Sequence, residues 1–282
     1  MEKLCGLPRR AVGISTGSSM AGPAHRFDDG AAYEEFMARW SRSLGRAFLC
    51  WAAPPVAAHW LDVGCGTGIL TELILQNCQP STVSGVDCSE AQIDYACRRG
   101  LGNRAELRVA DAQDLPFPNQ SFDVVASCLV VNFVADPSCA MSEMRRVARQ
   151  GGLVIACVWD FSLELSPSWP LRAALRRIGA GAPPVPGTSG SSLSGLTELF
   201  EHAGLGNIET SHLDIVAEFN SFDELWRSLT SGCAPTTRLI ADLPDSLREE
   251  LRESVQRDTE CLPNGLRQYR ARANAIKARK LD

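Results

Sequence analysis

The sequence lacks several patterns that would assign a protein to a class at once. Its eleven cysteines are scattered, with no C-x-x-C pair and no paired Cys/His spacing, so a metal site is not expected. No apolar run approaches the roughly 20 residues that cross a bilayer, and residues 1–25 lack the apolar segment of a signal peptide. We therefore expect a cytoplasmic protein without a membrane span, whose cysteines are reduced.

Basic runs and histidines are also scarce. The net charge is −5 with no long basic run, which argues against a nucleic-acid partner, because such binding needs a basic face that neutralises phosphates. Of the four histidines, His59, His202 and His212 are expected in structural or surface positions. Only His25, ahead of the first expected helix, is placed to act as a general base.

One stretch, residues 59–68, organises the rest of the chain. It reads H-W-L-D-V-G-C-G-T-G, an apolar strand followed by glycines at alternate positions, and apolar residues at helical spacing follow from Ile69. The glycines do not match the G-x-G-x-x-G dinucleotide fingerprint, and no Lys-Ser/Thr pair completes a P-loop. Strand, glycine turn and helix nevertheless predict a nucleotide-binding βα unit.

Further apolar runs repeat this alternation. Residues 83–86 end at Asp87, about 20 residues beyond the glycines, where a carboxylate is expected to bind a ribose diol. Residues 107–110 end at Asp111, and runs 122–127 and 153–158 flank a helix that begins at Asp136 and is expected to stop at the glycines 151 and 152. The pattern predicts an α/β fold with a Rossmann-like, doubly wound, mostly parallel sheet and ligands beyond the carboxyl ends of the strands.

These motifs, in this order, resemble the class I S-adenosylmethionine (SAM)-dependent methyltransferases. Within that class the chain is similar to the small-molecule branch that includes the ubiquinone and menaquinone C-methyltransferases. The matching motifs are D-V-G-C-G-T-G (62–68), G-V-D (85–87), A-D-A-Q-D-L-P-F (110–117), F-D-V-V (122–125) and E-M-R-R-V-A-R-Q-G-G (143–152). The resemblance covers residues 33–159 and implies a seven-stranded sheet with an antiparallel last strand, SAM as cofactor and S-adenosylhomocysteine as product.

The resemblance also implies which residues form the site. Asp62 would lie near the cofactor's amino group, Asp87 at the ribose hydroxyls and Asp111 at the adenine. The other cofactor contacts it implies are Tyr33, Gly64, Cys65, Gly66, Cys88, Ala112 and Leu129. The weaker candidates for substrate contact are Met37, Trp40, Asn132 and Trp159. Methyl transfer is an in-line displacement that depends on orientation, so no general base is obligatory, and the weak catalytic candidates are His25, Asn132 and Asp160. Four cysteines fall at or beside predicted strand ends, where small apolar filler is the simpler interpretation: Cys65, Cys88, Cys128 and Cys157.

The chain divides into four expected parts. Residues 1–27 are a mobile tail, and 28–160 are the SAM-binding core with an N-terminal covering helix. Residues 161–194 are a lid or substrate insertion that ends in a Pro/Gly/Ser-rich loop. Residues 195–282 complete the methyltransferase fold and carry a helical insertion at 221–262.

The leading hypothesis is a SAM-dependent methyltransferase that acts on a small molecule, as a monomer or homodimer. Two alternatives stay open, because a fold does not fix a function. One is a SAM-fold enzyme that catalyses a rearrangement or cyclisation without methyl transfer. The other is a non-catalytic SAM-binding partner.

Overall fold

The computed structural model describes residues 30–185, 187–230 and 235–281. The strands are β1 (His59–Val63), β2 (Thr82–Asp87), β3 (Glu106–Val109), β4 (Phe122–Cys128), β5 (Ala148–Trp159), β6 (Leu205–Phe219), β7 (Glu260–Cys261) and β8 (Arg267–Lys280). The α-helices are α1 (Gly30–Ala52), α2 (Ile69–Asn77), α3 (Glu90–Arg98), α4 (Pro137–Val147), α5 (Trp169–Arg177), α6 (Leu193–His202), α7 (Phe222–Thr230), α8 (Pro235–Ala241) and α9 (Asp245–Asp258). His25 and the expected tail lie outside the described residues, as does the side chain of Tyr33.

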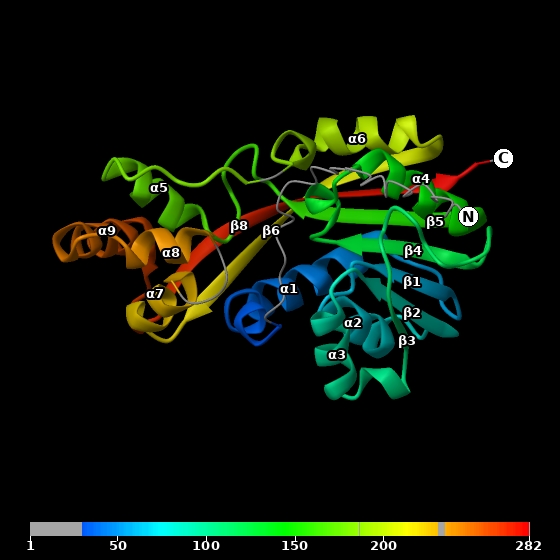
Figure 1. The fold of residues 1–282 in the computed structure, drawn as a ribbon, viewed down its shortest axis with the longest axis horizontal. Coiled ribbons are helices and arrows are strands. Elements are labelled where there is room, and N and C mark those ends of the chain that lie inside the picture. Colours follow the sequence, from blue (N-terminus) through cyan, green and yellow to red (C-terminus); the bar gives the residue numbers. More distant parts are fainter. Residues whose placement is uncertain (1–29, 186, 231–234, 282) are drawn as a thin grey trace, which may run out of the picture.

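The strands form one mixed sheet in the order β3-β2-β1-β4-β5-β8-β6, with the two-residue β7 paired to β8 (Figure 1). The first five strands run parallel, and β8 lies antiparallel between β5 and β6. The predicted fold class is confirmed, and the sequence had not indicated β7. None of the described helices combines the length and apolar character that a bilayer-spanning segment requires.

Helices cover both faces of the sheet, as a doubly wound fold requires. Helices α1 and α2 lie on one face and α4 and α6 on the other (Figure 1). Successive residues of β1 point to opposite faces, so Trp60 joins one core and Leu61 the other, and both are fully buried. This is why the central strands read as continuous apolar runs.

The boundary between α4 and β5 differs from the expectation. We expected the helix to continue to the glycines at 151 and 152, but α4 ends at Val147 and β5 begins at Ala148, which pairs with Phe122. Lys280, at the end of β8, donates through Nζ to the carbonyl oxygens of Arg146 (3.3 Å) and Ala148 (2.9 Å). This distant side chain satisfies carbonyls at the helix end that local sequence would assign to a glycine cap.

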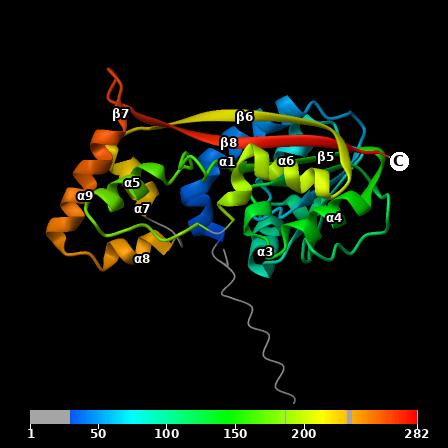
Figure 2. The ribbon, with the colours of Figure 1, turned by 90° about the horizontal axis from the view of Figure 1, so that it is seen from above.

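The long antiparallel strands β6 and β8 carry the chain away from the parallel core to a group of helices. Helices α5, α7, α8 and α9 gather around the far end of this pair (Figure 2). Tyr269 of β8 is buried where the two parts meet: its ring lies 4.8 Å from that of Trp40 and stacks at 5.8 Å on Phe219, and its hydroxyl donates to the Pro167 carbonyl (2.8 Å). Aromatic packing thus joins α1 to the strand pair.

The turn between β1 and α2 holds the start of α2 close to the end of β4. Gly64 has φ of 76°, and a Cβ there would lie 2.3 Å from Cγ2 of Val130. The N–H groups of Gly64 and Cys65 both donate to the Val86 carbonyl, at 2.8 and 2.9 Å. A side chain at position 64 would therefore push the turn away from both β2 and β4.

We predict that Gly64→Ala destabilises the cofactor-free protein more than Gly100→Ala does. Gly64 and Gly100 both have positive φ, 76° and 84°. An alanine in that conformation lowers the free energy of unfolding by roughly 1–2 kcal/mol at either site. Only at position 64 does the added methyl overlap a packed side chain, since position 100 has no atom within 4 Å, so we expect about 1–3 kcal/mol of extra loss. Urea unfolding measures both variants, and equal losses would show that the turn tolerates the methyl.

Candidate functional site

The carboxylate of Asp87, at the end of β2, connects the glycine turn to the helix that follows. Its Oδ2 accepts from the Gly66 N–H and its Oδ1 from the Ser89 N–H, both at 2.9 Å. Ser89 caps α3 through its Oγ, which accepts a hydrogen bond from the Gln92 N–H. The Ser89 N–H goes to Asp87, however, instead of the side chain at position 92 that a full capping box would use. Burial raises the pKa of Asp87 above its usual range.

Asp62 lies one residue before the end of β1 and is 1% exposed. Its Oδ2 accepts from the hydroxyl of Thr71 at 2.7 Å. Burial raises the pKa of this carboxyl to about 7; the Thr71 hydrogen bond opposes the shift and the nearby charge of Asp87 adds to it. Two carboxylates whose pKa values are raised by burial therefore lie beside the same turn.

Gly66, at the centre of the turn, leaves open space. It has φ of 52°, and a Cβ there would find its nearest atoms at 3.9 Å (Gln92 Oε1) and 4.0 Å (Asp87 Oδ2). Its N–H and those of Gly64 and Cys65 already bind Asp87 and Val86. The turn therefore presents open backbone and carboxylates, not the free amide donors of a phosphate-binding loop.

Five of the other expected cofactor contacts lie along the same carboxyl edge. Asp111 is exposed beyond β3, where its Oδ1 accepts from the Gln113 N–H (2.9 Å), and Ala112 follows it. Cys65 is buried and Cys88 exposed. Leu129, directly after β4, has φ of 66° and donates its N–H to the Cys157 carbonyl at 2.7 Å. The sheet edge thus brings these positions together at the ends of neighbouring strands.

Asn132 lies in a short turn after β4 and is 5% exposed, yet neither atom of its side-chain amide has a hydrogen-bond partner among the described residues. The backbone of Gly187 packs directly against it, because a Cβ on Gly187 would lie 2.1 Å from the Asn132 carbonyl oxygen. A buried amide without a partner costs about 1–3 kcal/mol.

The other expected substrate contacts are part of a buried wall. Trp40 and Trp159 meet edge to face with ring centroids 6.1 Å apart, and both are almost completely buried, as is Met37. The indole N–H groups of the two tryptophans have no partner among the described residues. Phe133 and Phe161 form a second edge-to-face pair, at 6.4 Å.

Asp160 and two of the three described histidines are engaged in local hydrogen bonds. Asp160 Oδ1 accepts from the Ser162 hydroxyl (2.6 Å) and the Leu163 N–H (3.0 Å), so this carboxylate caps the turn after β5. His59 bonds Thr82 (2.9 Å), His212 bonds Asn274 (2.7 Å), and His202 is exposed on α6. No described histidine therefore approaches the glycine turn.

Sequence reasoning missed several groups at this edge. The hydroxyls of Thr67 and Ser127 are buried without a partner among the described residues, and Thr71 binds Asp62. The sequence offered two signals for these groups. Ser127 is a polar residue at the end of the apolar run 122–127, and Thr67 and Thr71 flank the first turn of the helix that begins at Ile69. The contact between Gly187 and Asn132 joins residues far apart in sequence, so no local pattern could indicate it.

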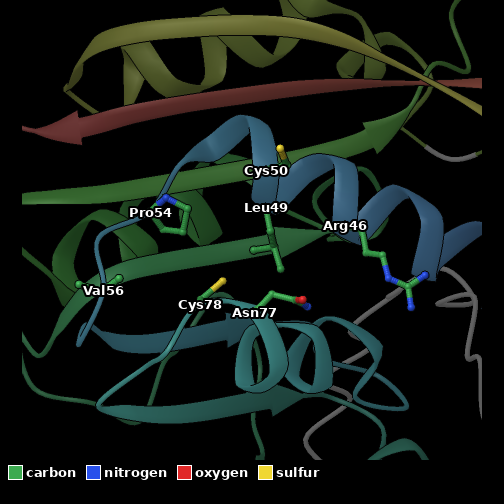
Figure 3. Close-up of a pocket in the computed structure, with 7 residues that line it drawn as sticks. All are labelled: Arg46, Leu49, Cys50, Pro54, Val56, Asn77 and Cys78. Atoms are coloured by element: carbon green, nitrogen blue, oxygen red, sulfur yellow. The ribbon is translucent and has the colours of Figure 1, made fainter.

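The cavity in Figure 3 is separate from this edge. It has a volume of about 300 Å³ and lies between the C-terminal ends of α1 and α2, whereas the glycine turn precedes the start of α2. The lining residues are Arg46, Leu49, Cys50, Pro54, Val56, Asn77 and Cys78. It contains no carboxylate. Within the described residues, no group of three or more Cys, His, Asp or Glu side chains is arranged to hold a metal ion.

Comparison with known proteins assigns part of the chain to a family. Residues 61–156 match the family described as the methyltransferase domain. A phosphatidylethanolamine N-methyltransferase of Cereibacter sphaeroides is 36% identical over 122 residues, which are 42% of this chain and 58% of that protein. A demethylmenaquinone methyltransferase of Roseiflexus castenholzii is 36% identical over 117 residues, 42% of this chain and 49% of that protein. The chain thus spans about half the length of these curated relatives.

A solved structure shares the fold over a longer stretch. The SAM complex of phosphoethanolamine N-methyltransferase 2 from Haemonchus contortus superposes with a TM-score of 0.57 at 18% identity, over 89% of this chain and 56% of that one. At this identity the likeness shows the fold alone. The family match shows that residues 61–156 form a methyltransferase domain, and the solved structure shows that the shared fold extends over most of the chain.

Proposed function

We propose that this protein transfers a methyl group from SAM to a small-molecule acceptor. The observation that carries the proposal is the pair of carboxylates, Asp62 and Asp87, beside the open backbone of Gly66. Among the described residues both carboxylates accept only from neutral donors. SAM, when bound, supplies an electrophilic methyl on a positively charged sulfonium and carries an ammonium group, and such a cation complements this site.

In this proposal each position at the carboxyl edge has a role. Asp62 binds the cofactor's ammonium group, Asp87 accepts from the ribose hydroxyls, and Asp111 lies at the adenine. Four further positions contact the cofactor through backbone or apolar atoms: Gly64, Cys65, Gly66 and Ala112. Leu129 packs along it, and Tyr33 and Cys88 complete the expected set.

The chain's contribution to the reaction is orientation and exclusion of water. Displacement at the methyl carbon needs acceptor, methyl and sulfur in line, which a rigid site provides. Asn132, with its unpaired buried amide, positions a polar group of the acceptor. Met37, Trp40 and Trp159 form an apolar wall that keeps water out. Asp160, His59 and His212 are engaged in other hydrogen bonds and His202 is exposed on α6, which supports catalysis by orientation.

The acceptor in this proposal is small and partly apolar. Relatives named for quinone and aminolipid methylation support that class, as does the aromatic wall. A net charge of −5 and the engagement of the α5 arginines support the absence of a nucleic-acid partner: Arg172 binds the Pro183 carbonyl, Arg176 binds Glu164 and Arg177 binds Asp258. None of the nine described cysteines forms a disulfide, which supports a reducing, cytoplasmic location, and we propose a monomer or homodimer.

We predict that the protein binds SAM and transfers its labelled methyl group to a component of a small-molecule extract, identified by mass spectrometry. Asp87→Ala should weaken SAM binding about 10–100-fold, because charge-assisted hydrogen bonds to the ribose are lost. Asp94→Ala is the matched control, since Asp94 is an exposed acid one turn into α3.

Calorimetry measures the affinities, with NAD as the negative ligand. Binding of NAD without SAM would overturn the cofactor assignment, and SAM binding without any labelled product would overturn methyl transfer. If Asp87→Ala binds SAM like the parent but melts at a lower temperature, the carboxylate has only a structural role. That role is to accept hydrogen bonds from the N–H groups of Gly66 and Ser89.

We predict that SAM affinity falls as the pH drops below about 7. In the free protein Asp62 holds a proton up to a pKa of about 7, and the cofactor ammonium must displace that proton to bind. Between about pH 7 and pH 5.5 the affinity should therefore fall roughly tenfold and level off above pH 7. Asp62→Asn should bind more weakly at neutral pH with a flat profile. The same slope in that variant would assign the titration to another group.

We further propose that the insertion at 161–194 closes over the acceptor. The described part of its loop packs Gly187 against Asn132, and the Ser191 carbonyl accepts from Asn274 at 2.7 Å, so the loop already reaches the site. Hydrogen exchange across 180–194 should slow when S-adenosylhomocysteine and the acceptor found by methyl labelling bind together. Helix α9 is the internal control. Unchanged exchange in 180–194 would contradict a lid.

A further inference from the structure

Two cysteine thiols lie in contact where β4 and β5 approach the site. The parallel register pairs Cys128, the last residue of β4, with Cys157, two residues before the end of β5. Their sulfur atoms are 3.3 Å apart, with the Cys157 thiol donating to the Cys128 sulfur. The sequence alone favoured small apolar filler for both cysteines. Two thiols in contact can, however, be oxidised to a disulfide, which apolar side chains cannot.

The two thiols have unequal environments. Cys157 is fully buried, and burial raises its pKa well above the usual range, so it stays a protonated hydrogen-bond donor. Cys128 is half-buried, so a small oxidant can reach its sulfur more easily than the sulfur of Cys157, which it contacts at 3.3 Å. Cys128 is therefore the nucleophile of the pair, and Cys157 is placed to react with it next.

We propose that Cys128 and Cys157 form a reversible disulfide when the protein meets hydrogen peroxide, and that the oxidised protein binds its cofactor more weakly. The Cys128 thiolate attacks one peroxide oxygen; an S–O bond forms, the O–O bond breaks, and the leaving hydroxide takes a proton to become water. The Cys157 thiol then attacks the sulfenic sulfur; the S–S bond forms, and the departing oxygen leaves as water with the thiol proton. Two thiols are oxidised and one peroxide is reduced to two waters.

The backbone geometry permits this bond. Neighbouring strands lie about 4.8 Å apart, within the roughly 4.4–6.8 Å between α-carbons that disulfides span. A disulfide is about 2.05 Å long, so the sulfurs must approach by about 1.2 Å from their 3.3 Å separation. Rotation of the half-buried Cys128 side chain and a small shift of the end of β4 can supply that movement.

The link to the cofactor rests on the proposed function. Leu129, which follows Cys128, donates its N–H to the Cys157 carbonyl at 2.7 Å, so both sides of the pair are coupled to the turn after β4. Val130 comes next and packs closely on Gly64. A Cβ added to Gly64 would lie 2.3 Å from Cγ2 of Val130. A shift at Cys128 is thereby transmitted through Val130 to the glycine turn.

The test treats the full chain with hydrogen peroxide, blocks remaining thiols by alkylation and maps the peptides without reduction. We expect a peptide pair linked through Cys128 and Cys157 in the parent and in Cys139→Ser, whose cysteine is exposed on α4. Affinity for S-adenosylhomocysteine should fall at least about tenfold and return after dithiothreitol. Cys128→Ser and Cys157→Ala should keep their affinity through the same treatment.

Absence of the linked peptide would overturn the proposal, as would an equal loss of affinity in both Cys128→Ser and Cys157→Ala. The peptide map needs no cofactor, so it separates this proposal from the proposed function. If the reduced parent fails to bind S-adenosylhomocysteine, the proposed function fails, and the map alone then decides whether the disulfide forms.

Discussion

The structure depends on the hydrogen bonds that hold the glycine turn against the end of β2. The N–H groups of Gly64 and Cys65 share the Val86 carbonyl, and that of Gly66 binds Asp87. Because these three donors are already used, they are not available to bind an anion, although the turn follows the same strand–turn–helix plan as an anion-binding nest. What remains at the edge is a pair of carboxyl groups and accessible backbone, which complement the cationic ligand that we propose for this site.

The aromatic wall, which we propose as the acceptor side of the site, is assembled from segments distant in sequence. Trp40 of α1 contacts both Trp159 at the end of β5 and Tyr269 of β8. Arg39, its neighbour, binds the Glu218 carbonyl and the carboxylate of Glu224, which connects α1 to β6 and α7. The aromatic wall and the outer helices are therefore one packed unit. A shift of the outer helices would move the residues that pack against Trp40.

Much of the parallel core could be predicted from sequence, because its signals are local. Apolar runs ending in Asp62, Asp87 and Asp111 indicate strands and place acids at their carboxyl ends, and Asp136 caps α4 by accepting from the next N–H groups. The departures arise from distant partners. Lys280 ends α4 early, and Asn274 holds the loop at Ser191. The contact of Cys128 with Cys157 depends on strand register, which no single run of residues encodes.

The position of β8 has a consequence for how the chain acquires its structure during synthesis. β8 lies between β5 and β6, yet it is translated after both of them. Until it emerges, β6 has no neighbour in the sheet, and the edge of β5 stays exposed in a nascent chain that already contains the entire glycine turn. Pairings of such high contact order form slowly, so this chain passes through a stage in which an open sheet edge can recruit other chains. A chaperone that shields β5 would act before β8 is made.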